Sequence, residues 1–252
     1  MRTYVVTGSA SGIGAATADR LSNAGHRVIG VDRDPGDLVY DLATASGRDG
    51  MVDAVRQRSD GRVDAVVACA GIADESPETI ATNFFGAVAT LEGLRPLLVR
   101  SDRPRAVVIA SVASILGADE AVVDLCLAGE ESAAIERTAA NPSMAYLTSK
   151  TALARWVRRT APSDAWAGAG IALNAIAPGT VRTPMTTELL EAPGGIEMVD
   201  AAVPMPLSGH ADADDIAPLL EFLASAENTR TTGQVVFVDG GADAVIRGDS
   251  TW

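Results

Sequence analysis

The sequence is poor in the residues that build disulfide frameworks and metal sites. Its 252 residues include two cysteines, Cys69 and Cys126, and two histidines. Two cysteines are too few for a disulfide framework, and they lack the spacing of a zinc site. The scarcity of histidine argues against a histidine-rich metal centre and against catalysis built on an Asp–His pair. We therefore expect no bound metal and a reduced, cytoplasmic setting.

Positive charge and long apolar runs are also scarce. The chain has 20 Lys and Arg against 33 Asp and Glu, which gives a net charge of −13. Such a chain repels nucleic acids and acidic membrane surfaces on average. The longest uncharged apolar run, residues 65–73, is shorter than the roughly 20 residues that span a bilayer. The first three residues lead straight into a strand-like run, so no signal peptide is expected. These absences predict a protein that binds neither nucleic acid nor membrane.

What is present is an alternation of apolar, β-rich runs with helix-like stretches. The run at 106–110, Ala-Val-Val-Ile-Ala, is continuously apolar, which is typical of a strand buried on both faces. Strands are predicted at 3–7, 27–31, 63–68, 105–110, 171–176 and 234–238, and helices at 12–24, 47–58, 77–99, 143–166 and 212–224. This alternation predicts an α/β protein with a Rossmann-like, doubly wound parallel sheet of about seven strands flanked by helices. Because no linker-like segment divides residues 1–252, we expect a single domain.

A glycine-rich turn joins the first expected strand to the first expected helix. It contains Gly8, Ser11, Gly12, Ile13 and Gly14. Gly8 permits a tight turn, Gly12 allows a phosphate to approach the backbone, and Gly14 lets the helix pack closely on the sheet. The start of the helix offers free N–H groups and a positive dipole end to a pyrophosphate. The turn therefore predicts a dinucleotide site.

Asp32 ends the second expected strand, where a carboxylate can accept hydrogen bonds from both ribose hydroxyls of an adenosine. The same carboxylate repels a 2′-phosphate by about 4 kcal/mol at a separation of about 4 Å. We therefore expect NAD rather than NADP, although the neighbouring Arg33 could partly neutralise a phosphate and leaves NADP use open. Asp41 and Leu42 could place a carboxylate and an apolar wall around the adenine, or they could simply begin a helix.

Tyr146 and Lys150 lie four residues apart on an expected helix, so their side chains share one face. Lys150 is the only lysine in the sequence, because the other 19 basic residues are arginine. A compact ammonium shifts its pKa more readily than a guanidinium. Together with a nicotinamide cation it could lower the pKa of the phenol from its usual value of about 10. Ser111 follows the strand at 105–110, where its hydroxyl could polarise a substrate oxygen or only cap the next turn.

Together these residues resemble the classical short-chain dehydrogenase/reductase family over nearly the whole chain. The matching motifs are 7–14, Asp32, Ala70-Gly71, Asn83, Ser111, Tyr146 with Lys150, Pro178-Gly179 and the Asp-Gly-Gly at 239–241. The resemblance implies that Tyr146 is the general acid/base, that Lys150 binds the nicotinamide ribose and lowers the pKa of the phenol, and that Ser111 orients the carbonyl or alcohol. It also implies that Asn83 holds a water linking Lys150 to solvent. Further cofactor contacts are implied for Ala70, Gly71, Pro178, Gly179, Val181 and Thr183.

The sequence departs from the family pattern in two places. Cys69 stands where the family usually has asparagine, and we interpret it as a small buried residue. Between Ser111 and Tyr146 lie 34 residues, many more than in most members. The added Ala- and Glu-rich segment at 119–141 predicts a helical insertion before the catalytic helix and is similar to the longer form of bacterial 3α-hydroxysteroid dehydrogenase/carbonyl reductases. We expect it to join or block the usual helix-bundle interface, which favours a homodimer and leaves a tetramer open.

Residues 180–210, which contain proline, glycine and methionine, predict a lid over the nicotinamide. Its apolar residues either line a substrate pocket or pack the lid onto the domain: Met185, Leu189, Leu190, Met198, Val199, Met205 and Leu207. We expect NAD-dependent interconversion of a bulky, apolar secondary alcohol and ketone, such as a steroid, terpenoid or aryl carbonyl. Three alternatives stay open: an aromatic primary alcohol dehydrogenase of the coniferyl type, a non-catalytic NAD-binding regulatory protein, and an epimerase or dehydratase. The intact Ser, Tyr and Lys disfavour the regulatory protein.

Overall fold

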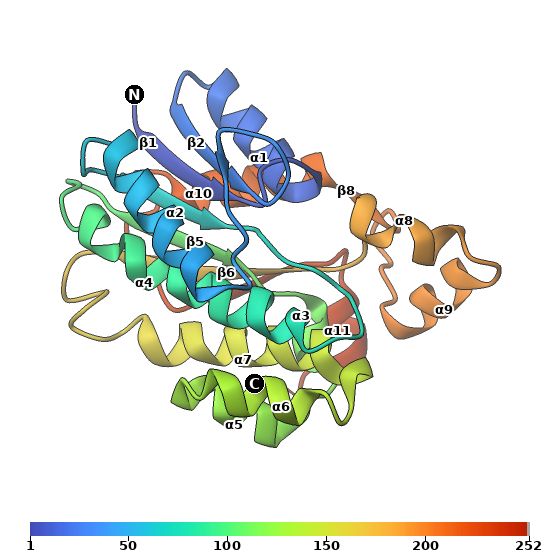
Figure 1. The fold of residues 1–252 in the computed structure, drawn as a ribbon. Helices are drawn as coiled ribbons and strands as arrows, with labels where there is room; N and C mark the ends of the chain where they lie inside the picture. Colours follow the sequence, from blue (N-terminus) through green and yellow to red (C-terminus); the bar gives the residue numbers. More distant parts are fainter. Residues whose placement is uncertain (251–252) are drawn as a thin grey trace.

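A sheet of seven parallel strands runs through the centre of the structure, a computed structural model that describes residues 1–250 (Figure 1). The strand order is β3-β2-β1-β4-β5-β6-β9. The bounds are β1 (Thr3–Thr7), β2 (Arg27–Asp32), β3 (Leu38–Val39), β4 (Ala65–Ala68), β5 (Arg105–Ile109), β6 (Ala172–Pro178) and β9 (Val235–Val238). The direction of winding reverses between β1 and β4. In open α/β sheets, ligands bind outside the carboxyl ends of the strands at this reversal.

Helices cover both faces of the sheet. One face carries α1 (Gly12–Asn23) and α10 (Ala213–Ala224), and the other carries α2 (Ala45–Arg58), α4 (Ala87–Leu98) and α7 (Ala145–Thr160). Because successive strand residues point to opposite faces, Tyr4 and Val6 pack on the α1 side and Val5 packs on the other. The predicted doubly wound parallel sheet is therefore confirmed. Among residues 1–250, no helix is both long and apolar enough to cross a membrane.

Several elements differ from the sequence-based expectations. The helix expected at 77–99 is interrupted, because α3 (Glu78–Ile80) leads into a π-helical turn, η1 (Ala81–Gly86), before α4 begins. The helix expected at 143–166 ends at Thr160, and Pro162 lacks the N–H that would extend it. β3 and α11 (Ala242–Arg247) were not expected. Elements as short as these carry too little periodicity to be recognised in a sequence.

The insertion forms two short helices, α5 (Glu120–Ala128) and α6 (Glu131–Thr138). Figure 1 shows both beneath α7. Asp119 caps α5, since its Oδ1 accepts a hydrogen bond from the Ala121 N–H at 3.0 Å. The Asp119 N–H donates to Thr148 Oγ1 at 3.0 Å, and this bond fastens the insertion to α7. The predicted helical insertion before the catalytic helix is present.

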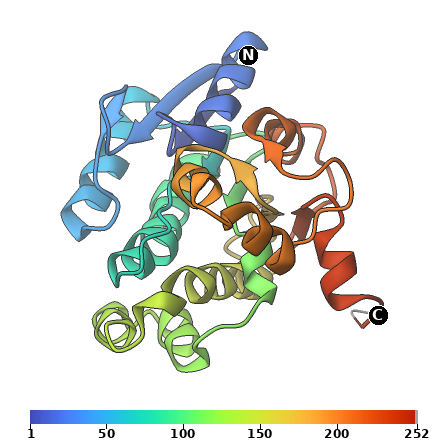
Figure 2. The same ribbon diagram turned by 90° about the vertical axis from the view of Figure 1, so that its right-hand side faces the viewer.

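The segment predicted as a lid contains β7 (Val181–Arg182), α8 (Pro184–Glu191) and α9 (Gly195–Ala202). β7 pairs with β8 (Ala211–Asp212) in a separate two-stranded sheet. α8 and α9 project from the body of the molecule and lie nearest the viewer in Figure 2. This segment therefore stands on the side of the molecule at which the carboxyl ends of the strands emerge, and its role as a lid stays a prediction.

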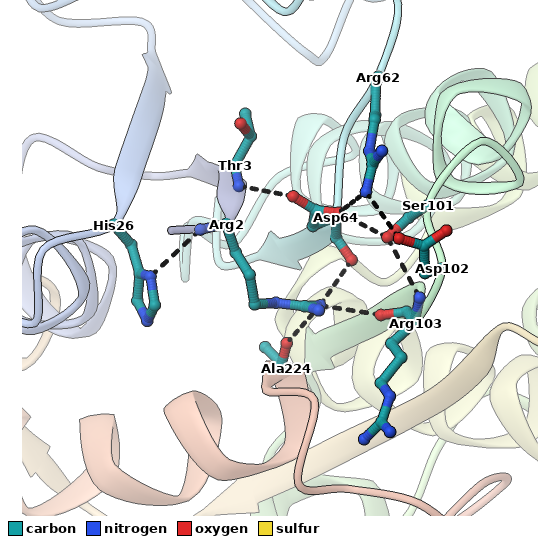
Figure 3. Close-up of polar contacts among 9 residues, drawn as sticks. All are labelled: Arg2, Thr3, His26, Arg62, Asp64, Ser101, Asp102, Arg103 and Ala224. Atoms are coloured by element: carbon teal, nitrogen blue, oxygen red, sulfur yellow. Dashed lines mark hydrogen bonds and ion pairs between the residues drawn. The ribbon is translucent and has the colours of Figure 1, made fainter.

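A polar network lies at the amino ends of the strands (Figure 3). We call it the amino-edge network, and its members are Arg2, Thr3, His26, Arg62, Asp64, Ser101, Asp102, Arg103 and Ala224. The Asp64 carboxylate, which precedes β4, accepts hydrogen bonds from the Thr3 N–H at 2.9 Å and the Ser101 hydroxyl at 2.5 Å. The Asp64 carboxylate also forms an ion pair with Arg62, whose Nη2 lies 3.4 Å from Oδ1. Burial raises the pKa of Asp64, but the hydrogen bonds from Ser101 and Thr3 and the charges of Arg2 and Arg62 outweigh burial and lower the pKa overall. The ionised carboxylate is therefore the form that this network stabilises.

Arg2 extends the amino-edge network to parts of the chain that are distant in sequence (Figure 3). Its Nη2 donates to the carbonyl oxygens of Asp64 and Arg103, both at 2.9 Å, and of Ala224 at 3.4 Å. One guanidinium thus holds the amino end of β1 to the segments before β4 and β5 and to the end of α10. The network lies at the edge away from the residues that the sequence analysis assigned to chemistry.

Candidate active site

A cavity of about 220 Å³ lies at the carboxyl ends of the parallel strands. Residues that end or directly follow β1, β2, β4, β5 and β6 line it, because parallel strands bring these ends to one edge. The lining also includes residues of α7 and of the segment around β7. The fold therefore gathers the separate sequence motifs around one space.

The glycine turn forms one end of this cavity. Gly8 and Gly12 have positive φ values of 68° and 51°, which glycine adopts without strain. A Cβ on Gly14 would lie 1.9 Å from the Gly8 carbonyl oxygen, so only glycine fits there. Ser11 precedes α1 with extended backbone, and its side chain makes no capping hydrogen bond. The free N–H groups of the first helical turn and the unused Ser11 hydroxyl fit a pyrophosphate.

Asp32 lies beside this turn at the end of β2. Its Oδ2 accepts a hydrogen bond from the Ala10 N–H at 2.8 Å, and its Oδ1 accepts one from the Asp34 N–H at 3.2 Å. An ionised carboxylate has about four acceptor positions, so two backbone donors leave room for a diol. Arg33 is exposed and also lines the cavity. The carboxylate is thus held in place, while the Arg33 guanidinium has no hydrogen-bond or ion-pair partner among residues 1–250.

Asp41 and Leu42 line one side of the cavity, and we call these two residues the side wall. Leu42 is buried and Asp41 is exposed. Asp41 also accepts a hydrogen bond from the Ala43 N–H at 2.9 Å, and Thr44 caps α2 by accepting from the Gly47 N–H at 3.0 Å. The sequence analysis left open whether these residues form a wall or only begin a helix. In the structure Asp41 and Leu42 line the cavity, whereas Thr44 caps α2, with Ala43 between them. That they surround an adenine stays a prediction.

Ser111, Tyr146 and Lys150 meet at the other end of the cavity. Ser111 Oγ accepts a hydrogen bond from the Ala113 N–H at 3.1 Å, so it caps the short helix η2 (Val112–Ile115) and also faces the cavity. Lys150 Nζ donates to the Ile109 carbonyl oxygen at 2.9 Å and lies 5.7 Å from the centroid of the Tyr146 ring. The phenol and the ammonium therefore face one space, as their spacing on α7 predicts.

The chain's own groups set the protonation of this site. Burial lowers the pKa of the Lys150 ammonium to about 8, with the nearby Cys69 acting in the opposite direction. Burial also raises the pKa of the Tyr146 phenol, and an interaction with the Ser111 side chain only partly offsets this. The sequence analysis expected Lys150 and a bound nicotinamide cation together to lower the pKa of the phenol, and that combined effect stays a prediction. The chain's own residues alone raise the pKa of the phenol, because burial disfavours a phenolate and the Lys150 ammonium donates to a backbone carbonyl.

Asn83 is fully buried in the π-helical turn and does not line the cavity. Its side chain holds the loop after β4, accepting from the Ile72 N–H at 2.8 Å and donating to the Ile72 carbonyl at 2.9 Å. It also donates to Ser149 Oγ at 3.1 Å, next to Lys150. In this structure the Asn83 side chain therefore joins the backbone of Ile72 to the hydroxyl of Ser149, the residue before Lys150. That Asn83 holds a proton-relay water stays a prediction.

The segment after β6 closes the remaining side of the cavity. Pro178, Gly179, Val181 and Thr183 all line it. A Cβ on Gly12 would lie 3.2 Å from Thr183 Cγ2, so the glycine turn and the start of α8 nearly touch across the cavity. The two halves of the predicted cofactor site thus approach each other in this structure.

Every residue that the sequence analysis assigned to the cofactor lines this one cavity, and so does Ser111. The lid residues are different: Met185 lines the cavity, but Leu189, Met198 and Leu207 are 43%, 57% and 73% exposed, and Val199 and Met205 are buried. Of the two alternatives for these residues, the position of Met185 fits a pocket lining, and the buried Val199 and Met205 fit packing of the segment onto the domain. Lining residues that sequence reasoning missed are Val31, Asp34, Tyr40, Cys69, Ile72, Thr82, Ile109, Ala110, Pro184 and Thr186. Most flank a motif residue, which was the available signal.

A parallel sheet in this order, with a glycine turn and a Ser–Tyr–Lys group around one cavity, defines a Rossmann-type, nucleotide-dependent oxidoreductase. A family model described as enoyl-(acyl carrier protein) reductase matches residues 8–243. The chain is 36% identical to the 3-alpha-hydroxysteroid dehydrogenase/carbonyl reductase of Comamonas testosteroni over 98% of both chains. It is 29% identical to the coniferyl-alcohol dehydrogenase of Pseudomonas sp. strain HR199 over 94% of both. The 3-alpha-hydroxysteroid dehydrogenase from Pseudomonas sp. B-0831, solved in complex with NADH, matches with a TM-score of 0.91 and 39% identity, over 98% of this chain and 99% of that one. The chain belongs to the short-chain dehydrogenase/reductase family.

Proposed function

We propose that the protein is an NAD-dependent oxidoreductase that interconverts a bulky, apolar secondary alcohol and its ketone. The observation that carries this proposal is the placement of Ser111, Tyr146 and Lys150 in the same cavity as the glycine turn and Asp32. A regulatory protein that only binds a nucleotide has no need of a buried phenol and ammonium beside that nucleotide. The similarity to a hydroxysteroid dehydrogenase/carbonyl reductase supports the substrate class.

The cavity residues divide the cofactor between them. The glycine turn would hold the pyrophosphate, Asp32 the adenosine ribose, and the side wall the adenine. Lys150 would bind the nicotinamide ribose, and the segment from Pro178 to Thr183 would lie along the nicotinamide. When bound, the dinucleotide supplies the hydride acceptor or donor and, in its oxidised form, a positive charge near Tyr146.

The chain's own residues manage the proton. During alcohol oxidation the Ser111 hydroxyl donates a hydrogen bond to the substrate oxygen, and the Tyr146 oxygen takes the alcohol proton. During ketone reduction Tyr146 returns that proton. Because burial alone raises the pKa of the phenol, the neighbouring cations must favour the phenolate for the oxidation to run near neutral pH. Lys150, with a pKa of about 8, can lose or regain a proton in the same pH range.

The preference for NAD rests on Asp32. Two backbone donors fix the carboxylate, so it cannot swing away from a 2′-phosphate, and the repulsion costs about 4 kcal/mol at close range. The exposed Arg33 opposes this by attraction. We expect kcat/KM with NAD to exceed that with NADP, and a higher value with NADP contradicts this part of the proposal.

The substrate class rests on the apolar character of the lid. Met185 reaches the cavity, and four further large apolar side chains of the lid are exposed. Exposed apolar groups beside a cavity favour a ligand with apolar surface. A panel of steroid, terpenoid and aryl alcohols against small polyols tests this. Faster turnover of the polyols overturns the substrate assignment. The likeness to a coniferyl-alcohol dehydrogenase favours adding cinnamyl-type primary alcohols to the panel.

The decisive experiment is Tyr146→Phe, assayed with NAD and the best alcohol of that panel. We expect activity to fall by about 10³-fold or more, because general acid–base catalysis contributes about 10²–10⁴-fold, while NADH binding is kept. Tyr4→Phe is the matched control, since Tyr4 is a core residue whose hydroxyl has no hydrogen-bond partner in residues 1–250. Full activity in Tyr146→Phe contradicts the mechanism. A cofactor that stays bound through turnover without net NADH formation supports an epimerase or dehydratase instead.

A further inference from the structure

One arginine connects the insertion to the side wall of the cavity. Arg48, in the first turn of α2, binds the Glu131 carboxylate of α6 in two hydrogen bonds, from Nη2 at 2.5 Å and from Nη1 at 2.8 Å. The same guanidinium donates from Nε to the Leu42 carbonyl at 2.7 Å and from Nη2 to the Ala43 carbonyl at 2.9 Å. One side chain therefore joins the insertion to the side wall.

The backbone of the side wall depends on these bonds and on close packing. The carbonyls of Leu42 and Ala43 are consecutive, and both point to the same guanidinium. On the other side, a Cβ on Gly86 would lie 2.9 Å from the Leu42 carbonyl oxygen and 3.1 Å from Leu42 Cβ. A Cβ on Gly47 would lie 1.9 Å from the Asp41 carbonyl oxygen. The wall is thus held between two glycines and Arg48, without strand pairing of its own.

Charge makes Glu131 the essential partner of this contact. The Arg48 side chain is 9% exposed, whereas the Glu131 side chain is 33% exposed. A buried guanidinium needs a counter-charge, and removing its partner leaves a costly unpaired charge. Bidentate pairing also fixes the plane of the guanidinium, and in that plane Nε points to the Leu42 carbonyl and Nη2 to the Ala43 carbonyl. Without Glu131, Arg48 gains by turning toward water and releasing the wall.

We propose that Glu131 is a positioning residue for the adenosine half of the dinucleotide, acting through Arg48 on Asp41 and Leu42. This inference rests on the proposed function, because it concerns the cofactor site of that function. It gives the insertion a role inside the subunit: the segment that distinguishes this chain from shorter family members sets cofactor affinity. The hydride-transfer end of the cavity, at Tyr146 and Lys150, lies outside the contact.

The test compares Glu131→Gln with a matched control, Glu120→Gln. Glu120 belongs to the same insertion and also binds an arginine in two hydrogen bonds, to Arg155 at 2.5 and 2.9 Å. Unlike Arg48, Arg155 makes no side-chain hydrogen bond within residues 1–250 to a residue that lines the cavity. The readouts are the dissociation constants of NADH and of ADP-ribose, which lacks the nicotinamide, together with kcat and KM for NAD.

We expect Glu131→Gln to weaken NADH and ADP-ribose equally, by on the order of tenfold, and to raise KM for NAD while kcat at saturation stays unchanged. Glu120→Gln should bind both ligands like the wild type. Binding in Glu131→Gln within twofold of Glu120→Gln overturns the inference, and so does a fall in kcat with no change in KM. If Glu131→Gln fails to fold, Glu131→Asp keeps the charge and should give an intermediate loss. A wild type that binds neither NADH nor ADP-ribose contradicts the proposed function itself.

Discussion

Burial of the Lys150 ammonium lowers the stability of the folded protein. It is 4% exposed, it donates to one carbonyl, and burial lowers its pKa to about 8 from an ordinary 10.5. A difference of this size corresponds to about 3 kcal/mol against the charged form, at 1.36 kcal/mol per pKa unit. Side chains of this kind gather at functional sites, where stability is given up for chemistry.

We therefore expect Lys150→Met to abolish turnover and to raise the free energy of unfolding at pH 7 by about 1–2 kcal/mol, the lost hydrogen bond offsetting part of the gain. The sign follows from proton binding. Between the folded pKa of about 8 and the unfolded pKa of about 10.4, only the unfolded wild type holds the proton, so wild-type stability rises with pH. The advantage of the mutant should shrink across that range. Urea unfolding at pH 7 and pH 10 measures it, and a mutant less stable than wild type at pH 7 contradicts the argument.

The helices and strands show which parts of the fold the sequence determines locally. Continuous apolar runs placed six strands of the central sheet, because burial on both faces requires that pattern. The two-residue strand β3, the π-helical turn and the outward course of α8 and α9 could not be predicted, since each depends on contacts with residues far away in sequence. The site divides in the same way. Residues in turns and at strand ends were found, whereas the inward side chain of Asn83 and the exposed Leu189 depend on what packs against their helices.

The β1–α1 connection gives a sharp prediction at this scale. Gly14→Ala would place a Cβ 1.9 Å from the Gly8 carbonyl oxygen, so α1 has to move away from the sheet. We expect a loss of roughly 1–3 kcal/mol in the free energy of unfolding and a marked loss of NADH binding.

Gly36→Ala is the control for this prediction. The nearest atom to a Cβ there is the Asp34 carbonyl oxygen, at 3.9 Å. Thermal unfolding and NADH titration should leave this control near wild type. Equal behaviour of the two variants would show that the glycine turn tolerates a side chain, against the geometry.

The amino-edge network lies at the amino ends of the parallel strands, and the cavity lies at their carboxyl ends. We therefore expect a change in the network to affect the stability of the protein without affecting its turnover. Asp64→Asn tests this separation. We expect it to lower the free energy of unfolding at pH 7 by about 1–3 kcal/mol, since a charged, hydrogen-bonded carboxylate is lost. Turnover at 25 °C should be unchanged.

The pH dependence of this effect has a definite sign. The folded pKa of Asp64 is lowered, so its contribution is complete above the unfolded pKa of about 3.9 and is lost as the pH falls through the folded value. The difference between wild type and Asp64→Asn should therefore be constant from pH 5 to 8 and narrow below about pH 4. Unfolding curves across that range measure it, and a difference that grows in acid is the contrary result.

The insertion also bears on assembly. α5 covers part of α7, so a second copy cannot approach that part of α7 directly. We propose a homodimer, to be checked by light scattering of the wild type and of a variant lacking residues 119–140. If the wild type and the deletion variant are both tetramers, the insertion has no role in assembly.

The single ε-amine of this protein has a practical consequence. Among the side chains of residues 1–252, an acylating reagent directed at amines meets one target, the enclosed Lys150. Modification of the lysine then requires the reagent to enter the space between the glycine turn and α8. The rate of this modification, followed by mass spectrometry, therefore measures how readily a reagent enters that space.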